Sequence, residues 1–332
     1  MTAVPPSDQT TQIVDLVREF VRRDVDPVAS KYDNDDVYPA ELADRMAELG
    51  LFGITIPEEY GGLGLDHSTF AAIFLELARG WMSLTGILGT HHLMATIIAN
   101  GGTEEQKQRF LPRMAQGELR GGLGLTEAEA GSDVQNIQTT AVRDGDDYVV
   151  NGSKLFITNA ERGHAFAVLA RTDPGADPPY RGLSCFVVEK DASRVEIGQH
   201  FDKLGYRGVD TAELVFRDCR VPAANLVGEQ EGRGFAQVMG ALESGRINVA
   251  ARAVGVATAA FEAAVKYAQQ RKTFGVPIAQ HQAIQIKLAD MAPRSRPPVC
   301  SRTTQPARRT RARGSTSRPV WPSCSRRRCA AR

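Results

Sequence analysis

The sequence predicts an α+β protein: a helical N-terminal region, a small β domain, and a second, incomplete helical region. Apolar residues recur at spacings of three and four through roughly the first 118 positions, which is typical of amphipathic helices. Short β-rich runs broken by Gly, Pro and Asp follow, and an alanine-rich helical pattern then begins near residue 230 and stops at Pro293. We therefore place the domain boundaries at 1–119, 120–228 and 229–292, followed by a tail at 293–332.

The N-terminal region contains its own start signals for helices. One apolar stripe is formed by Ile13, Leu16, Val17, Phe20 and Val21. Ser68 is the expected N-cap of an apolar helix over residues 68–79. Thr103 followed by Gln106 predicts a capping box for the helix after it.

The middle region reads as strands and turns. Asp144-Gly145 lies between two β-rich runs and predicts a hairpin. The runs AFAVLAR, LSCFVVEK and AELVFRD are expected strands of a barrel-like sheet. In the region after residue 230, one helical stripe is formed by Ile247, Ala251, Val254, Phe261 and Val265, and the many alanines favour helix and close helix packing.

Composition excludes several classes of protein. The chain has 332 residues and a net charge of +1, long enough to bury a sizeable core. We find no apolar run near the roughly 20 residues of a membrane helix, and no secretory signal. The body contains only Cys185 and Cys219, which we expect to be buried thiols of a cytoplasmic protein. His91 and His92 lack a third ligand nearby, so no metal site is assigned.

The near-zero net charge hides a split between body and tail. The first 292 residues hold 28 basic and 39 acidic residues, a net charge of −11, whereas the last forty hold twelve Arg and neither Lys, Asp nor Glu. This Arg/Pro/Ser-rich tail has no apolar period and is expected to be disordered. It resembles a GC-rich gene read out of frame after residue 292, an interpretation we favour over a basic arm for nucleic acid.

The most informative motif is GLGLTEAEAGSDVQN, residues 122–136. Gly131 allows close backbone approach to a ligand, while Thr126 and Ser132 offer short hydroxyl donors. From these residues alone, an exposed strand-to-loop turn remains the alternative. No GxGxxG dinucleotide motif is present.

The wording LTEAEAGSD resembles the first signature of the acyl-CoA dehydrogenase family. Four further pieces agree in order and spacing: IPEEYGGLGLD (56–66), GTEEQKQRFLPRMAQGE (102–118), NGSKLFITNA (151–160) and QRKTFGVPIAQHQAIQIKLADMA (270–292). The resemblance covers roughly residues 10–292 and implies that family's helical–β–helical fold. Asn136 departs from the signature, which usually has a small residue there.

The resemblance implies an FAD site. Leu123, Leu125 and Thr126 would contact the isoalloxazine ring, Phe156 would cover it, and Thr158 would reach its N5 region. Ser132 would lie beside both flavin and acyl-CoA. The FAD of a neighbouring subunit would be contacted by Arg271, Thr273, Phe274, His281 and Gln282, and the substrate's CoA or thioester would be faced by Glu243 and Arg246. Taken singly, each of these residues also fits an ordinary core or surface role.

The resemblance further implies an α,β-dehydrogenation of an acyl-CoA thioester. A carboxylate removes the α-proton and the β-hydrogen passes as hydride to flavin N5. In most of the family the base is a Glu far along the C-terminal domain; no Asp or Glu follows residue 292 here. Some members place it immediately before the Arg of the LESGR segment, where this chain has Gly245. We therefore assign no catalytic residue and expect impaired activity.

The intact family form is expected to be a homotetramer in acyl-CoA or fatty-acid metabolism, with electron-transfer flavoprotein as the acceptor. Two alternatives stay open: a flavin-dependent oxidase or monooxygenase on the same fold, and a catalytically silent FAD-binding fragment.

Overall fold

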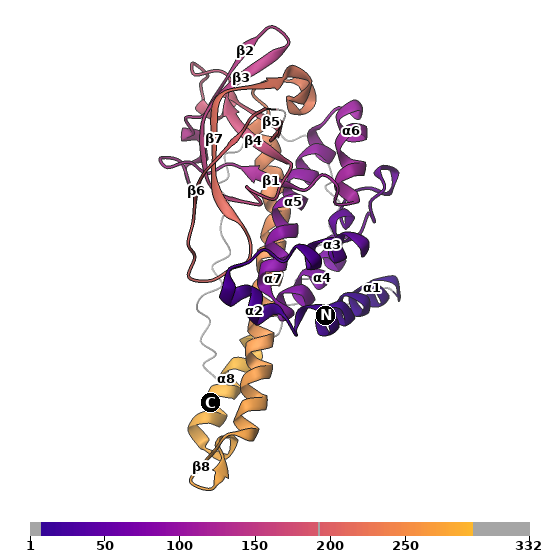
Figure 1. Ribbon diagram of the computed structural model, residues 1–332, viewed down its shortest axis with the longest axis vertical. Coiled ribbons are helices and arrows are strands. Elements are labelled where there is room, and N and C mark those ends of the chain that lie inside the picture. Colours follow the sequence, from indigo (N-terminus) through magenta and orange to yellow (C-terminus); the bar gives the residue numbers. More distant parts are fainter. Residues whose placement is uncertain (1–7, 192, 295–332) are drawn as a thin grey trace, which may run out of the picture. The chain divides into compact units, whose positions relative to one another are not determined.

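The computed structural model describes residues 8–191 and 193–294. The predicted disordered tail at 293–332 therefore lies outside the described residues from position 295 onward. Within the described part, helices come first, a sheet follows, and two helices close the sequence, as the sequence predicts (Figure 1).

The N-terminal helices enclose one apolar core. Their bounds are α1 Asp8–Phe20, α2 Ala29–Asp35, α3 Ala40–Glu48, α4 His67–Gly80, α5 Met82–Gly101 and α6 Glu104–Ala115. Four residues of the predicted first stripe point to the core, but Leu16 is 49% exposed because it lies at the stripe's edge. Short helical turns at η1 Val21–Val25, η2 Leu51–Gly53 and η3 Glu58–Tyr60 connect these helices.

The helix caps show one confirmed prediction and one wrong one. Thr103 and Gln106 form the predicted reciprocal capping box of α6. The N-cap of α4 is Asp66, not Ser68: its carboxylate accepts the backbone N–H groups of Ser68 and Thr69 at 2.7 and 2.9 Å. A carboxylate is the stronger acceptor at a positive helix end, so it displaces the hydroxyl from this position.

The middle region is a curled sheet of seven strands in the order β1-β4-β2-β3-β7-β6, with β5 paired to β4. The strands are β1 Gly121–Gly124, β2 Thr140–Asp144, β3 Asp147–Thr158, β4 Ala165–Arg171, β5 Leu183–Glu189, β6 Glu196–His200 and β7 Thr211–Pro222. The predicted hairpin joins β2 to β3, with Gly145 at φ 65°. Cys185 and Cys219 are buried free thiols, as expected.

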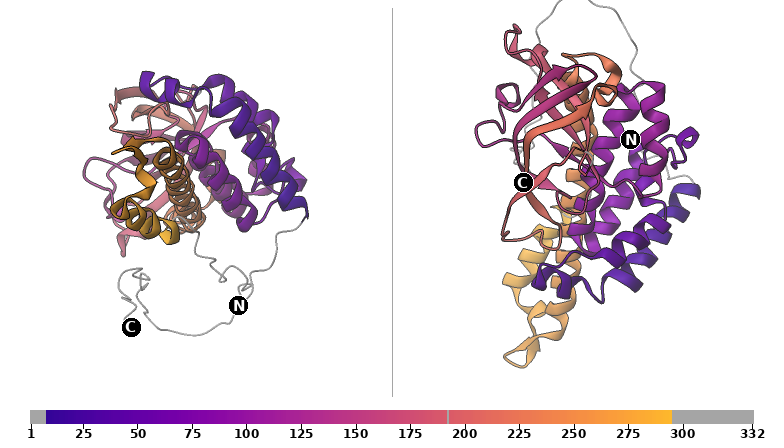
Figure 2. Two further views of the ribbon diagram at one scale, coloured as in Figure 1. Left: turned by 90° about the horizontal axis from the view of Figure 1, so that it is seen from below. Right: turned by 45° about the horizontal axis from the view of Figure 1, so that its top comes forward.

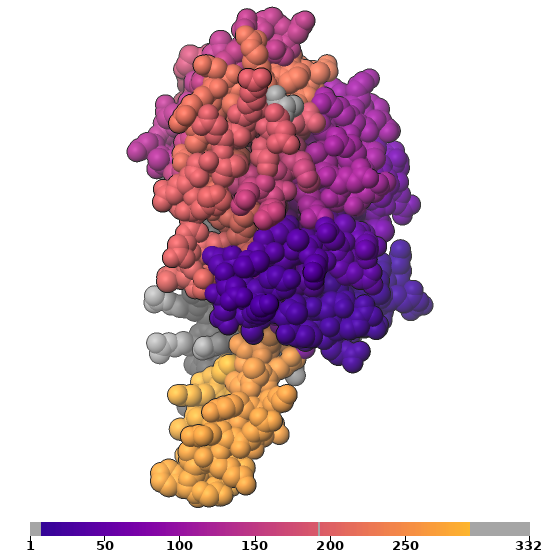
Figure 3. Space-filling view, viewed as in Figure 1, coloured from indigo at the N-terminus to yellow at the C-terminus, as the bar shows by residue number. Residues whose placement is uncertain are grey.

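The chain then forms α7 Gly234–Gln270, the short strands β8 Lys272–Thr273 and β9 Val276–Pro277, and α8 Gln282–Arg294. The first half of α7 packs beside α4 and α5 and against β5 (Figure 2). Arg79 of α4 still pairs with Glu262 of α7 at 2.7 Å, but the last turns of α7 and the whole of α8 are uncovered on the face drawn in Figure 3. Tyr267 and Ile286, both on this segment, are more than half exposed.

Two helices of the described residues, α5 and α7, are long and apolar enough to cross a membrane, so length and composition alone do not exclude a span. They differ in burial: 72% of the apolar window of α5 is buried inside the protein, against 17% of that of α7. α5 is therefore a core helix, and α7 carries apolar surface that this single chain leaves open.

His91 and His92 lie side by side on α5, both fully inside the core. His91 Nε2 donates to the carbonyl of Phe52 at 3.1 Å, and His91 Nδ1 accepts the N–H of Gly121 at 3.3 Å. His92 Nε2 donates to the carbonyl of Leu51 at 3.0 Å. These contacts tie α5 to η2 and to the start of β1, and burial favours the neutral form of both rings.

The buried pair predicts acid sensitivity. Burial lowers the pKa of His92 to about 4 and that of His91 well below its ordinary value. The unfolded chain then binds more protons than the folded one below about pH 6.5. Stability is therefore lost as pH falls, by about 3 kcal/mol for His92 between pH 6.5 and 4.

Urea unfolding at several pH values checks this expectation. His92→Gln should flatten the loss between pH 6.5 and 4, whereas His200→Gln, at an exposed position, should leave it unchanged. Equal pH slopes for the parent and the His92 variant would contradict the assignment.

Candidate functional site

Two segments that the sequence marks as flavin-binding lie next to each other. Leu123 is on β1, and Leu125 and Thr126 follow it directly. The carbonyl of Thr126 accepts the N–H of Leu155, on β3, at 2.8 Å. This bond brings the Leu123–Thr126 segment beside Phe156 and Thr158, so five predicted flavin residues gather at one place.

Phe156 is turned outward by an irregularity of β3. The pairing of β3 with β7 shifts register between Lys154 and Ile157, and Phe156 adopts φ 59°. A bulge re-aims side chains, and a positive φ is costly for an aromatic residue. The Phe156 ring is 60% exposed and rests on Phe201, with the ring centroids 4.5 Å apart. Strain held at an exposed aromatic ring is typical of a binding site.

The chemistry of this surface fits a flavin ring. Leu123 and Leu125 are half-buried apolar groups, and Thr126 and Thr158 are half-buried hydroxyls beside them. Among the described residues, neither threonine side chain has a hydrogen-bond partner, although both main chains are tied into the sheet. Unused donors next to apolar side chains suit a planar heterocycle with ring nitrogen and oxygen acceptors.

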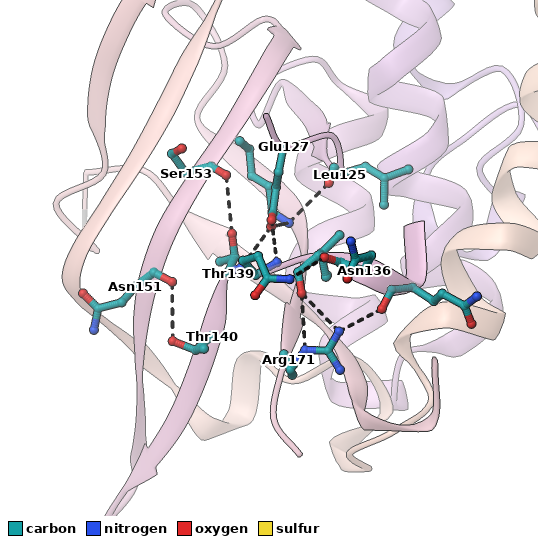
Figure 4. A network of polar contacts seen from close by, with 12 residues as sticks. Leu125, Glu127, Asn136, Thr139, Thr140, Asn151, Ser153 and Arg171 are labelled. Atoms are coloured by element: carbon teal, nitrogen blue, oxygen red, sulfur yellow. Dashed lines mark hydrogen bonds and ion pairs between the residues drawn. The ribbon is translucent and has the colours of Figure 1, made fainter. Parts of the chain in front are cut away.

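Segment 125–139, which links β1 to β2, is held at its base by a buried ion pair (Figure 4). Lys154 Nζ lies 2.6 Å from Glu127 Oε1 and 3.3 Å from the Leu125 carbonyl. Glu127 also accepts the N–H groups of Gln138 at 2.5 Å and Thr139 at 3.0 Å. The side chain of Lys154 is 0% exposed and that of Glu127 7%.

Glu127 and Lys154 each stabilise the charged form of the other, which burial alone would disfavour. Burial alone would raise the pKa of Glu127, but the Lys154 ammonium and the backbone donors outweigh it and the pKa lies below its ordinary value. Burial lowers the pKa of Lys154 to about 8, against the attraction of Glu127. Removing one partner would leave an unpaired buried charge, which is strongly destabilising.

The same segment is held from its other side by Arg171. The guanidinium donates to the carbonyls of Gln135 at 2.8 Å and Ile137 at 3.1 Å (Figure 4). Ser132 lies between the two attachments and is exposed. It has no hydrogen-bond partner among the described residues, so its hydroxyl is free to meet a ligand.

The remaining predicted flavin residues form a second group beyond the end of α7. Arg271 ends the helix, Thr273 is on β8, and Gln282 begins α8. Thr273 Oγ1 lies 2.7 Å from His281 Nε2. Phe274 is 98% exposed with φ 53°, its ring edge-on to His281.

The two groups do not meet within one chain. Ala241 of α7 packs in the same core as Leu123 and Leu125. From there the helix runs on to Gln270, about 44 Å at 1.5 Å per residue. The Arg271–Gln282 group therefore cannot reach the flavin-facing strands of its own subunit.

The predicted substrate residues lie in the first half of α7. Glu243 and Arg246 are both exposed, and Glu243 is in the third turn of α7, not the first turn where a simple helix-dipole charge is placed. Between them, Ser244 and Gly245 line a cleft of about 20 Å³ between α4, α5 and α7. The cleft has no carboxylate in its lining, so no described residue is placed there as a base.

The structure adds residues that the motif did not identify. Asn159, at φ 62°, donates to the carbonyls of Ile87 and Gly121 at 3.0 and 3.1 Å, tying the end of β3 to α5 and β1. Lys154 and Arg171 are further anchors. The sequence could have pointed to Lys154, because a charged residue at an inward position of an apolar strand usually has a buried partner.

A cavity of about 340 Å³ lies next to Phe201 and is also lined by Tyr38 and Asp210.

Comparison with protein families matches almost the whole described chain. The acyl-CoA dehydrogenase N-terminal domain model matches residues 7–118, the middle domain model 122–219, and the C-terminal domain model 232–296.

Curated relatives agree with these matches. The acyl-CoA dehydrogenase of Bacillus subtilis (strain 168) is 42% identical over 84% of this chain and 73% of its own length. The acryloyl-CoA reductase (NADH) of Anaerotignum propionicum is 42% identical over 83% of this chain and 70% of its own length.

Solved structures share the fold. Butyryl-CoA dehydrogenase from Megasphaera elsdenii has a TM-score of 0.84 at 36% identity, over 89% of this chain and 77% of that one. A chain of the structure described for the electron transferring flavoprotein of Acidaminococcus fermentans has a TM-score of 0.85 at 41% identity, with the same coverage. The chain belongs to the acyl-CoA dehydrogenase family.

Proposed function

We propose that the chain carries the FAD and acyl-CoA binding surfaces of an α,β-dehydrogenase, and that its own activity is impaired because no carboxylate among the described residues is placed as the base. The observation that carries this proposal is the bond from the Leu155 N–H to the Thr126 carbonyl, which holds Thr126 beside the strand that carries Thr158 and the exposed ring of Phe156. Their apolar faces and unused hydroxyls have the character a flavin ring requires.

In this proposal, the FAD contacts come from two subunits. Leu123, Leu125, Thr126, Phe156 and Thr158 would hold the ring, and Ser132 would meet both ring and substrate. Arg271, Thr273, Phe274, His281 and Gln282 would hold the FAD of a neighbouring subunit, with Arg271 facing the pyrophosphate. Bound FAD would supply the hydride acceptor.

Substrate positioning falls to the first half of α7. Arg246 is exposed, as a contact to CoA requires, and Glu243 lies nearly one turn before it. One structural neighbour is a butyryl-CoA dehydrogenase, so a short acyl-CoA is the first substrate to test. The acryloyl-CoA reductase among the relatives means that the reverse reaction is the second candidate direction.

The proposal also includes a second copy of this chain and an electron acceptor as partners. The uncovered apolar surface of α7 supports a homo-oligomer, a tetramer by resemblance. The neighbour from the electron transferring flavoprotein structure supports an electron-transfer flavoprotein as acceptor. We place the protein in the cytoplasm.

Supplying a carboxylate at position 245 should restore chemistry. A Cβ on Gly245 would meet only the far end of the Leu93 side chain, at 3.0 Å, which can turn aside. Gly245→Glu places an acid where some family members have the base. With FAD in excess, we expect butyryl-CoA to bleach the flavin absorbance anaerobically at least tenfold faster than in the parent chain.

Gly245→Gln is the matched control, because it has the same shape without the acid. It should bleach no faster than the parent. Rapid bleaching by the parent itself would show that a base is already present and would overturn the impairment.

The second group predicts a separate effect on cofactor affinity. Arg271 is exposed, with no ion-pair partner among the described residues, so Arg271→Ala should leave the unfolding free energy within about 0.5 kcal/mol. Loss of a charge-assisted contact to FAD should weaken binding roughly 10- to 100-fold. Flavin fluorescence titration measures this. Lys287→Ala on α8 is the control, and an equal loss there would refute the specific role of Arg271.

A further inference from the structure

The two flavin-facing segments are joined by charges in the protein interior. Lys154 is on β3, two residues before Phe156 and four before Thr158. Glu127 follows Thr126 directly in segment 125–139. Their 2.6 Å contact therefore connects the two pieces of backbone that carry the predicted ring contacts.

The Glu127–Lys154 pair also forms hydrogen bonds to the backbone of segment 125–139. Lys154 also donates to the Leu125 carbonyl, and Glu127 accepts from the backbone of Gln138 and Thr139, at the far end of the segment. One carboxylate thus closes the segment into a loop, with its two ends held together at β3. The segment contains only one short helical turn, η4 Val134–Asn136, so these bonds define much of its path.

We propose that Glu127 and Lys154 are positioning residues of the flavin site: their buried ion pair fixes the backbone of segment 125–139 against β3, so that Leu125, Thr126 and Ser132 present themselves to the flavin together with Phe156 and Thr158. Neither residue touches the flavin. The inference rests on the proposed placement of FAD at this surface.

An apolar or neutral pair of similar volume often folds as well as a buried ion pair. A pair kept only for stability could therefore be replaced without effect on the loop or on FAD. The geometry indicates a different role, because three backbone groups of segment 125–139 are bonded by these two side chains: the Leu125 carbonyl and the amides of Gln138 and Thr139.

The test compares Glu127→Gln/Lys154→Met with a control pair in the same domain, Glu196→Gln/Arg217→Met. The control removes an ion pair of 3.1 Å whose side chains are 53% and 73% exposed. Amide hydrogen exchange is measured on the full chain, resolved at Gln138 and Thr139. We expect these two amides to exchange at least tenfold faster in the Glu127/Lys154 variant, with unchanged protection on β4 and β5, and no change in the control.

Binding of added FAD gives the second readout. We expect about tenfold weaker binding for the Glu127/Lys154 variant and parent-like binding for the control. Unchanged exchange at Gln138 and Thr139, exchange raised equally across the whole domain, or parent-like FAD affinity with a loosened segment would each overturn the proposal.

The parent chain provides a check that needs no variant. Its Gln138 and Thr139 amides should be as protected as those of β3, and exchange as fast as that of the exposed residues Asp133 and Gln135 would overturn the proposal. Failure of the parent to bind FAD counts against the proposed function alone, because the exchange data still decide whether the pair holds the segment.

Discussion

The length of α7 is the constraint on which the site depends. One end of this helix is packed into the core shared with β1 and β5, and the other carries Arg271 and Thr273. A rigid helix of 37 residues keeps these ends about 55 Å apart. On the proposed assignment, a flavin site is therefore completed by residues of a second copy, and the uncovered apolar surface of α7 is the surface that such an assembly would bury.

The other half of the site depends on backbone held by side chains. Segment 125–139 connects β1 to β2, which both pair with β4, and it contains one short helical turn, so little regular hydrogen bonding is available to it. Glu127, Lys154 and Arg171 supply that bonding instead, and Asn159 joins the end of β3 to α5 and β1. Because these anchors hold the backbone, the hydroxyls of Thr126 and Ser132 and the exposed ring of Phe156 remain available to a ligand.

The order of the elements could be predicted because local patterns decide it. The capping box at Thr103, the Asp144-Gly145 turn and the alanine-rich stripe of α7 all act within a few residues of themselves. What the patterns left out depends on distant partners. The bulge at Phe156 arises from the pairing of β3 with β7, and Lys154 of β3 meets Glu127, 27 residues before it in segment 125–139. The Asp66 cap is a local feature, and it was missed because Asp66 and Ser68 are both residue types that suit an N-cap. The site was predicted from word order, and its anchors became visible only in three dimensions.

The central claim is that FAD binds between two copies of this chain. The most direct measurement is light scattering of the purified protein during gel filtration with added FAD, recorded together with the visible flavin spectrum of each fraction. The account predicts flavin absorbance only in fractions with the mass of a dimer or larger. Flavin bound stoichiometrically to a monomer would contradict it, because one chain would then be closing the site alone.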